Sequence, residues 1–590
     1  MSNSVTGKAF DLVIFSRILS YVRVYKFQFI MSLFAVLALA LLSGGVRPLL
    51  LKHIVNDYII NKDAEKLLLF VLIMLGVLLT EVILQFIFIF FANWLGQNVI
   101  KDMRTRLFKR ILKFRTKYFN TTPVGKLVTR VVSDIETIAS VFGQGLFIIV
   151  SDLLKMVILL AVMFYTDWQL TLIVLAILPV LIYATKIFQI KIKISFQDIR
   201  NQVANLNSFV QERISGMKIV QLFSRENIEY DKFERINEKH KNAYVKTIFY
   251  YAVFFPIIDI LSAVTLGLIV WYGGLKAANA NNPEMLGVIT MFLTTAQALF
   301  RPLRQIADKF NTLQMGIVAA DRVFTVMDVK EDEPDTGTLV APHFKGNIEF
   351  KDVYFSYLPD EPVLKGISFE AKPGETIAVV GATGAGKSTL INLLSRFYPI
   401  KKGAISIDGT NISEFTLSSL RNEISLVLQD VFLFSDTIFN NITLHNNDIT
   451  IDEVKEAAQL IGIHNFIMSL PGNYEYNVKE RGGMLSSGQR QLIAFLRAYV
   501  SKPAILVLDE ATSSIDAHSE KLIQKATKII TKNRTSIVIA HRLATIKSAD
   551  KIIVMDRGKI VEKGTHAELL KKGGYYSKLY EIQFETAKAS

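Results

Sequence analysis

Long uncharged apolar runs constrain the fold of this chain more than any other feature of its sequence. Residues 27–46 contain no charged side chain and lie between Lys26 and Arg47. A run of about 20 apolar residues is long enough to cross the hydrocarbon core of a bilayer. The chain has 590 residues and is 51% hydrophobic, which is too long for one domain and too apolar for an ordinary soluble protein. Part of it is therefore expected to lie in a membrane.

Five further apolar segments complete a predicted membrane domain with six transmembrane helices. They are residues 67–94, 142–166, 168–185, 247–275 and 285–300. The last is short and is expected to continue as a helix past Arg301. Glu81, Asp152, Lys155 and Asp259 interrupt these segments, and ionisable residues at membrane depth are costly unless they face a cavity or each other. Asp152 and Lys155, spaced i and i+3, could neutralise each other on one helix face, or the charges could serve a substrate or a proton.

The connections between the spans orient the chain in the membrane. Residues 96–139 and 186–246 are long and rich in Lys and Arg, whereas the other connections are short and poor in them. Basic loops stay on the cytoplasmic side, so both termini and these loops are expected in the cytoplasm of a multi-pass protein of the cytoplasmic (inner) membrane. Helical periodicity in residues 101–113 and 203–233 predicts that the membrane helices extend into the cytoplasm, with short crossing helices at their tips.

The overall charge and the absence of cysteine exclude several kinds of partner and site. The net charge is +14, but the basic residues crowd into the loops, which indicates membrane topology rather than a nucleic-acid partner. The sequence contains no cysteine, so a disulfide framework and Cys-ligated zinc or iron–sulfur sites are excluded.

A domain boundary is expected near residue 335. Residues 328–342 are charged, contain Pro and Gly, and show no periodicity, so they are interpreted as a linker. The predicted transmembrane domain covers residues 1–327, and a less apolar domain covers residues 343–590.

The second domain contains a phosphate-binding pattern. Residues 381–388 read GATGAGKS, fit G-x-x-x-x-G-K-[ST], follow a short apolar run and open a helix-like segment. The glycines let successive backbone N–H groups converge on phosphate oxygens at a helix N-terminus. Lys387 is expected to reach the β- and γ-phosphates, and the Ser388 hydroxyl to bind Mg²⁺.

Two carboxylates end a second apolar run in the same domain, residues 504–510. Asp509 can hold Mg²⁺ through water, and Glu510 can polarise a water for attack on the γ-phosphate. Such a run is common in α/β domains, and the phosphate-binding pattern upstream of it favours the catalytic interpretation.

At residues 485–489, LSSGQ resembles the signature sequence of the ATP-binding cassette (ABC) family, and the resemblance covers essentially the whole chain. Further motifs match in order: Tyr357 resembles the adenine-stacking aromatic, Gln429 the Gln-loop, residues 513–516 the dimer loop and His541 the switch histidine. Residues 119–125 with Arg130 and Asp134, residues 212–216 with Glu226, and residues 480–482 resemble segments through which exporters of this family couple their domains. Thr383, Leu496 and the SSID form of the dimer loop are modest departures, and none removes a catalytic group.

The resemblance implies an all-α polytopic membrane domain with six transmembrane helices, followed by an α/β phosphate-loop ATPase domain. It implies catalytic roles for Glu510, His541 and Lys387, and Mg²⁺ ligands at Ser388, Gln429 and Asp509. The residues implied in ATP binding are Tyr357, Gly381, Ala382, Thr383, Gly384, Ala385, Gly386, Lys387, Ser388, Thr389, Gln429, Ser486, Gly488, Gln489 and Asp516.

The function that the resemblance implies is ATP-driven export of an amphiphilic substrate, such as a lipid, drug or peptide, by alternating access. The signature at a helix N-terminus is a second phosphate-binding end, and the chain's own phosphate loop already holds its γ-phosphate. The signature must therefore serve a second molecule, so a homodimer in membrane lipid is expected. A heterodimeric exporter, an ATP-gated channel or regulator, and an importer are the alternatives. The intact Glu510 and signature favour the homodimer.

Overall fold

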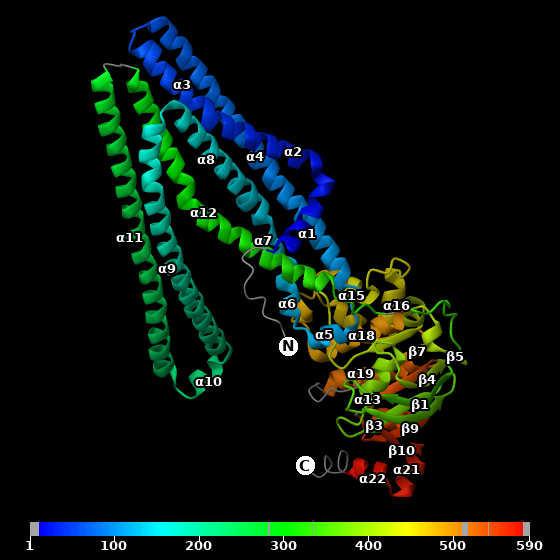
Figure 1. The fold of residues 1–590 in the computed structure, drawn as a ribbon. Helices are drawn as coiled ribbons and strands as arrows, with labels where there is room; N and C mark the ends of the chain where they lie inside the picture. Colours follow the sequence, from blue (N-terminus) through cyan, green and yellow to red (C-terminus); the bar gives the residue numbers. More distant parts are fainter. Residues whose placement is uncertain (1–10, 281–283, 334, 510–516, 541, 582–590) are drawn as a thin grey trace. The chain divides into compact units, whose positions relative to one another are not determined.

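The computed structural model describes residues 11–280, 284–333, 335–509, 517–540 and 542–581, and the chain divides into two compact units. The helical unit comprises Met1–Lys113 and Thr122–Lys330, and the α/β unit comprises Phe114–Thr121 and Glu331–Ser590. Figure 1 shows long helices in the first and the β-strands in the second. The short segment at residues 114–121 thus belongs to the α/β unit although the helical unit surrounds it in sequence.

The helical unit is built from long helices interrupted by short π-helical turns. Its α-helices are α1 (Leu12–Val22), α2 (Lys26–Leu41), α3 (Arg47–His53), α4 (Ala64–Ile111), α6 (Val124–Thr129), α7 (Ile135–Ser140), α8 (Phe147–Thr166), α9 (Trp168–Ser215), α10 (Met217–Leu222), α11 (Glu226–Ala280) and α12 (Met285–Met327). The turns between them are the 3-10 turn η1 (Arg23–Tyr25) and the π-helical turns η2 (Leu42–Val46), η3 (Ile54–Ile59), η4 (Arg130–Asp134) and η5 (Val141–Leu146).

Five helical segments of the described chain are long and apolar enough to cross a membrane. They are Leu12–Ile59, Ala64–Ile111, Val124–Thr166, Trp168–Ser215 and Glu226–Ala278. The predicted sixth span lies on α12 and is not among them, since its apolar run at residues 285–300 is shorter than the roughly 20 residues that a bilayer requires. α12 does continue through Arg301, as expected, and the sixth span stays a prediction.

The helices are longer than a membrane requires, as the periodicity of the loops predicts. α4 and α9 have 48 residues each and α11 has 55, whereas about 20 residues cross the hydrocarbon core. The short helix α10 joins α9 and α11 at their tip (Figure 1). Asp63 and Asp167 begin α4 and α9, because each side chain accepts backbone N–H groups of the first turn.

The α/β unit contains two sheets. A four-stranded sheet has the order β2-β1-β4-β5, and a six-stranded sheet has the order β10-β9-β3-β8-β7-β6. The strands are β1 (Ile348–Phe355), β2 (Leu364–Ala371), β3 (Thr376–Gly381), β4 (Lys402–Ile407), β5 (Thr410–Asn411), β6 (Ile424–Val427), β7 (Ile505–Asp509), β8 (Thr535–Ile539), β9 (Lys551–Asp556) and β10 (Lys559–Gly564). β9, β3, β8, β7 and β6 pair in parallel.

Helices flank these strands and complete the unit. They are α5 (Thr116–Thr121), α13 (Lys387–Leu394), α14 (Leu417–Asn422), α15 (Ile438–Thr443), α16 (Ile451–Ile461), α17 (His464–Met468), α18 (Ser487–Val500), α19 (Ala517–Thr531), α20 (Leu543–Ser548), α21 (His566–Lys572) and α22 (Tyr575–Tyr580), with 3-10 turns η6 (Ile412–Glu414), η7 (Asn473–Glu475) and η8 (Glu480–Gly482). Apolar residues form cores on both faces of the parallel strands: Leu506 belongs to one core and Val507 to the other. This two-sided burial explains why the strands are continuous apolar runs in the sequence.

Candidate functional site: a phosphate loop and a membrane cavity

The phosphate-binding loop joins β3 to α13, in the strand-to-helix setting that the sequence predicts. Gly381 has φ 154°, and a Cβ there would lie 2.2 Å from the backbone oxygen of Met555. Gly386 has φ 99°, and a Cβ there would lie 2.8 Å from Leu364 Cδ2. Neither position accepts a side chain, so the glycines allow the loop to curl at the N-terminus of α13. Backbone N–H groups and the helix dipole make this end an anion site.

Lys387 is the cation of this loop. Its Nζ donates hydrogen bonds to the Gly381 oxygen at 2.7 Å and the Ala382 oxygen at 2.9 Å, and the residue is 8% exposed. Burial lowers the pKa of the Lys387 ammonium, and the nearby charge of Asp509 acts in the opposite direction. An ammonium held out of bulk water interacts more strongly with an anion than an exposed one. The loop therefore presents one positioned positive charge to a phosphate.

Two oxygen ligands suitable for Mg²⁺ lie beside this lysine. Asp509 ends β7, and its Oδ2 lies 3.4 Å from the Ser388 hydroxyl at the start of α13. Mg²⁺ prefers oxygen ligands and is commonly held by one or two protein groups together with substrate phosphates. The hydroxyl and the carboxylate fit that chemistry, so these residues can hold the ion predicted from the sequence.

The strand register brings the ends of β3, β8, β7 and β6 to the same sheet edge. In the parallel pairing Val379 of β3 aligns with Ile539 of β8, and Ile539 aligns with Asp509 of β7. Val427 of β6 aligns with Leu508, so the exposed Gln429 follows its strand at this edge. Glu510, residues 511–516 with Asp516, and His541 lie outside the described residues, and their roles stay predictions.

Tyr357 lies close to the start of α13. Its hydroxyl donates to the Thr389 hydroxyl at 3.3 Å and accepts from Asn392 Nδ2 at 3.1 Å. Its ring packs edge-on against Phe355 and Tyr398, at interplanar angles of 90° and 87°, and the residue is 38% exposed. Edge-on neighbours hold the ring while leaving ring surface for a further aromatic group. The predicted adenine-stacking role fits this arrangement.

The signature sequence forms the N-terminus of α18. Ser486 caps the helix by accepting from the Gln489 N–H at 3.2 Å, while Gln489 Oε1 accepts from the Ser486 N–H at 2.9 Å. The side chain of Ser486 is exposed and Gly488 is buried. The sequence predicts ATP contacts for Gln489, and the reciprocal cap gives its side chain a structural task that this prediction missed. The capped end presents the positive end of the helix dipole to an anion.

Comparisons with known proteins decide the family. Residues 29–302 match the family described as ABC transporter transmembrane region, and residues 364–513 match the family described as ABC transporter. The chain is 34% identical over 588 residues to the uncharacterised ABC transporter ATP-binding protein YknV of Bacillus subtilis, covering 99% of this chain and 97% of that protein. It is 36% identical over 566 residues to an ATP-dependent lipid A-core flippase of Desulfotalea psychrophila, with coverage of 95% and 97%. The chain belongs to the ABC transporter family.

This ABC transporter is a half-transporter, since it fuses a transmembrane region and an ABC ATPase domain in one chain. It is a multi-pass membrane protein and hydrolyses ATP to drive transport. An ATP-dependent lipid A-core flippase of Syntrophus aciditrophicus is a further relative, 34% identical over 576 residues that cover 98% of this chain and 95% of that protein.

The ABC transporter's α/β unit contains a contact that the sequence does not predict. Asn120 of α5 donates to the Tyr398 hydroxyl at 2.9 Å, and the Tyr398 ring lies 5.0 Å from the Tyr357 ring. Arg115 fixes the same segment, because its N–H donates to the Glu331 oxygen at 3.0 Å. Asn120 belongs to the segment that resembles the first cytoplasmic loop of exporters, and Tyr398 links this residue to the predicted adenine-stacking ring within the α/β unit. Asn120 and Tyr398 lie 278 positions apart in the sequence, and only the resemblance of the loop could have drawn attention to them.

The predicted loop residues of the helical unit have structural partners. Arg130 forms an ion pair with the buried Asp134, and Arg322 of α12 lies 3.5 Å from the same carboxylate. Arg213 forms an ion pair with Glu229 of α11, which ties the end of α9 to the next long helix. These contacts stabilise the loops within their own unit.

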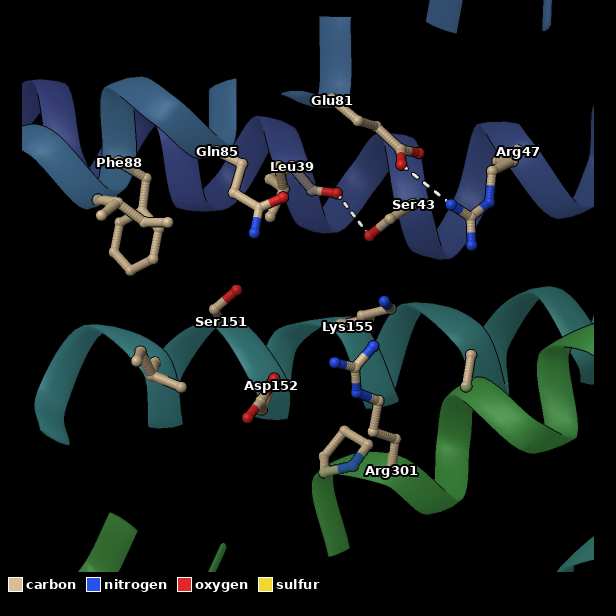
Figure 2. Close-up of a pocket in the computed structure, with 14 residues that line it drawn as sticks. Leu39, Ser43, Arg47, Glu81, Gln85, Phe88, Ser151, Asp152, Lys155 and Arg301 are labelled. Carbon is tan, nitrogen blue, oxygen red and sulfur yellow. Dashed lines mark hydrogen bonds and ion pairs between the residues drawn. The ribbon is translucent and has the colours of Figure 1, made fainter. Parts of the chain in front are cut away.

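A second candidate site of this ABC transporter lies in the helical unit. A cavity of about 470 Å³ is lined by residues of α2, η2, α3, α4, α8 and α12. In it, Arg47 Nη1 lies 3.1 Å from Glu81 Oε2, the one ion pair drawn among its lining residues (Figure 2). Glu81 is therefore paired with a residue of another helix and lines a cavity. Both features reduce the free-energy cost of a carboxylate at membrane depth.

Asp152 and Lys155 line the same cavity and do not neutralise each other by direct contact. No hydrogen bond or ion pair joins them among the residues in Figure 2, although both line the cavity. Both side chains line the cavity, and mutual neutralisation and a role toward a substrate or a proton both stay predictions. Arg301 lines it as well, whereas Asp259 is not among its lining residues.

Proposed function

We propose that this half-transporter works as a homodimer that exports an amphiphilic substrate across the cytoplasmic membrane by alternating access. The observation that carries the proposal is the presence of a phosphate loop on α13 and a capped signature on α18 in the same ATPase domain. Both are helix N-termini suited to phosphate, and one γ-phosphate cannot be held by both ends of the same chain. Two chains would then enclose two ATP molecules, each between the loop of one and the signature of the other.

In this proposal the residues of the sheet edge divide the work on ATP. Lys387 neutralises the β- and γ-phosphates, Tyr357 stacks on adenine, and Ser388, Gln429 and Asp509 are the groups that would hold Mg²⁺. The ion, when bound, neutralises charge on the phosphates. Glu510 accepts a proton from the attacking water, and His541 orients that water. Asp516 and the signature of the second chain complete the site.

The substrate class is proposed from two observations. Relatives of similar length are named ATP-dependent lipid A-core flippases, which points to amphiphilic lipids as a class. The cavity of the helical unit combines charged side chains with apolar ones, a lining suited to an amphiphile. Movement of the ATPase domains would be passed to the spans through the cytoplasmic loops, with ATP closing the dimer and hydrolysis resetting it.

The topology and domain limits are part of the same proposal. The basic loops favour a cytoplasmic location for both termini and for the ATPase domain, in the inner membrane. The transmembrane domain is proposed to end at residue 327, the linker at 342, and the ATPase domain to occupy residues 343–590.

Purification of the tagged chain alone tests the homodimer against the heterodimer and the ATP-gated channel. Reconstituted in liposomes, it should hydrolyse ATP as a dimer of one chain and move a fluorescent lipid between leaflets only with ATP. Activity that requires a second half-transporter would establish the heterodimer. ATP-dependent ion current without substrate movement would establish the gating alternative.

A further inference from the structure

The cavity in Figure 2 gathers the polar positions of helices that are otherwise apolar. α4 contributes Glu81 and Gln85, spaced i and i+4, and α8 contributes Ser151, Asp152 and Lys155 within one helical turn and a half. Residues at these spacings share one helix face. Three of the four charges that interrupt the predicted spans, Glu81, Asp152 and Lys155, therefore line one space.

Close packing between η2 and α8 fixes the position of α8 beside the cavity. A Cβ on Gly44 of η2 would lie 3.2 Å from Ile158 Cγ2 and 3.4 Å from the Lys155 backbone oxygen. The glycine thus permits the two segments to approach at the level of Lys155. η2 is a π-helical turn, a feature frequent at functional sites, and it carries Ser43, which lines the cavity.

The charges of the cavity are only partly paired with one another. Arg47 and Glu81 form an ion pair, and the second carboxylate oxygen of Glu81, Oε1, is buried without a hydrogen-bond partner among the described residues. Asp152, Lys155 and Arg301 make no ion pair among the residues drawn in Figure 2. Asp152 attracts Lys155 and Arg301 electrostatically without a direct ion pair. Charged groups at membrane depth are costly, so a ligand that places opposite charges in direct contact with them would be favoured.

From this pattern we infer that the cavity binds the headgroup of a zwitterionic amphiphile, with its oxyanion at Lys155 and Arg301 and its amine at Asp152 and Glu81. This inference rests on the proposed export function and names the substrate class within it. The cavity lining contains both positive and negative side chains. A simple anion would pair only with the positive ones, and a simple cation only with the negative ones. A headgroup that joins a phosphate and an amine supplies both.

The rest of the lining suits the acyl part of such a molecule. Figure 2 shows Phe88 at the end of the cavity away from Arg47, with Leu39 between them. A volume of about 470 Å³ falls in the usual range of about 300–1,000 Å³ for small-molecule sites, which accommodates a headgroup and the first part of a chain. A neighbouring cavity of about 690 Å³ shares Arg47 and Arg301 and adds space beside the charged end.

The test compares three probes of equal chain length on the full chain in a nonionic maltoside detergent. Lysophosphatidylethanolamine is zwitterionic, lysophosphatidylglycerol is anionic, and an alkylamine is cationic. Native mass spectrometry titrations give Kd for each probe. The wild type should bind the zwitterion at least about tenfold more tightly than either other probe, a difference of about 1.4 kcal/mol. Binding of the anionic probe as tightly as the zwitterion would overturn the inference.

Two variants should shift the charge preference in opposite directions. Lys155→Gln should raise Kd for the zwitterion about tenfold and leave the alkylamine bound as well or better. Asp152→Asn should raise Kd for the zwitterion by a similar factor and tighten binding of the anionic probe. Equal changes in Kd for all three probes in both variants would show that these residues affect the form of the cavity and do not distinguish the charge of the ligand. That result would overturn the inference.

The double variant separates ligand binding from mutual neutralisation. If Asp152 and Lys155 each bind part of the headgroup, the double variant should bind the zwitterion worse than either single variant. If they serve only to neutralise each other, the double variant should regain wild-type binding, and the inference fails. Asp259→Asn is the matched control, since it removes an intramembrane carboxylate that does not line this cavity, and its Kd values should equal those of the wild type.

The outcome is distinguishable from failure of the export proposal. A wild type that hydrolyses ATP and moves lipid, yet shows no preference for the zwitterion, contradicts the inference alone. A wild type that binds the zwitterion but moves no lipid with ATP contradicts the export proposal.

Discussion

The ATP site and the membrane cavity hold their charged groups in different ways. In the α/β unit, Lys387 is held by carbonyls of the same loop, those of Gly381 and Ala382, six and five residues away. In the helical unit, Arg47 is held by Glu81, 34 residues away on another helix. The backbone of one loop builds the first arrangement, and packing between helices builds the second. Local sequence therefore predicts the first site in detail and the second only as a set of unusual charges.

The largest effect is expected from the cation of the loop. Lys387→Ala should abolish ATP hydrolysis, because it removes the cation that we propose faces the β- and γ-phosphates. ATPase assays and binding of a fluorescent ATP analogue measure the loss. Lys372→Ala removes an exposed lysine from the preceding turn and should retain activity. Near-wild-type hydrolysis by Lys387→Ala would contradict the assignment of the phosphate loop.

Replacing glycine by alanine should change the free energy of unfolding in opposite directions in the two regions. Gly381→Ala puts a Cβ 2.2 Å from the Met555 backbone oxygen and should destabilise the ATPase domain by about 1–3 kcal/mol. Gly76→Ala lies within α4 with no atom within 4 Å of the added Cβ, and should stabilise the protein by about 0.5–1 kcal/mol. Thermal unfolding in detergent measures the direction of the stability change in each variant. Equal tolerance at the two positions would mean that the loop does not depend on its backbone conformation.

Loss of the Tyr357 ring should weaken the ATP site less than loss of the Lys387 ammonium. Tyr357→Ala should weaken ATP binding by about 1–3 kcal/mol, the usual range for loss of a base–aromatic stack. Tyr357→Phe keeps the ring and loses only the hydroxyl bonded to Thr389, so its Kd should change by no more than about tenfold. GTP binding should fall as much as ATP binding, since stacking does not read the base edge. An equal loss in Tyr357→Phe and Tyr357→Ala would assign the role to the hydroxyl instead.

The smallest effect is expected at the link between α5 and Tyr398. Tyr398→Phe removes the hydroxyl that accepts from Asn120 but keeps the ring against Tyr357. The ratio of lipid-stimulated to basal ATPase should fall about two- to tenfold, the scale of one hydrogen bond. Asn120→Ala should give the same loss, and the double variant should add nothing to it. Additive losses would show that the two residues act independently.

Particular residues show how far the sequence predicts this molecule. The loop glycines, Lys387 and the strand ending at Asp509 follow from local pattern, because strand–loop–helix geometry fixes them within a few residues. The cap formed by Gln489 was missed, since a capping box and a ligand contact use the same residue types. The cavity shared by Asp152 and Lys155 was not predicted, because their spacing allows a pair on one helix but does not reveal the space that both line. The contact of Asn120 with Tyr398 depends on tertiary structure alone.

The most direct test of the central claim, two equivalent ATP sites shared by two copies of this chain, is the nucleotide content of Glu510→Gln. A carboxamide is a much poorer base than a carboxylate, so hydrolysis should fall about a hundredfold or more while ATP is still bound. In ATP and Mg²⁺, the purified variant should retain two ATP molecules per dimer of the single chain, with a spin-label pair across the membrane helices reporting an outward-open state. Normal hydrolysis, failure to retain ATP, or one trapped ATP for every two chains would contradict the account.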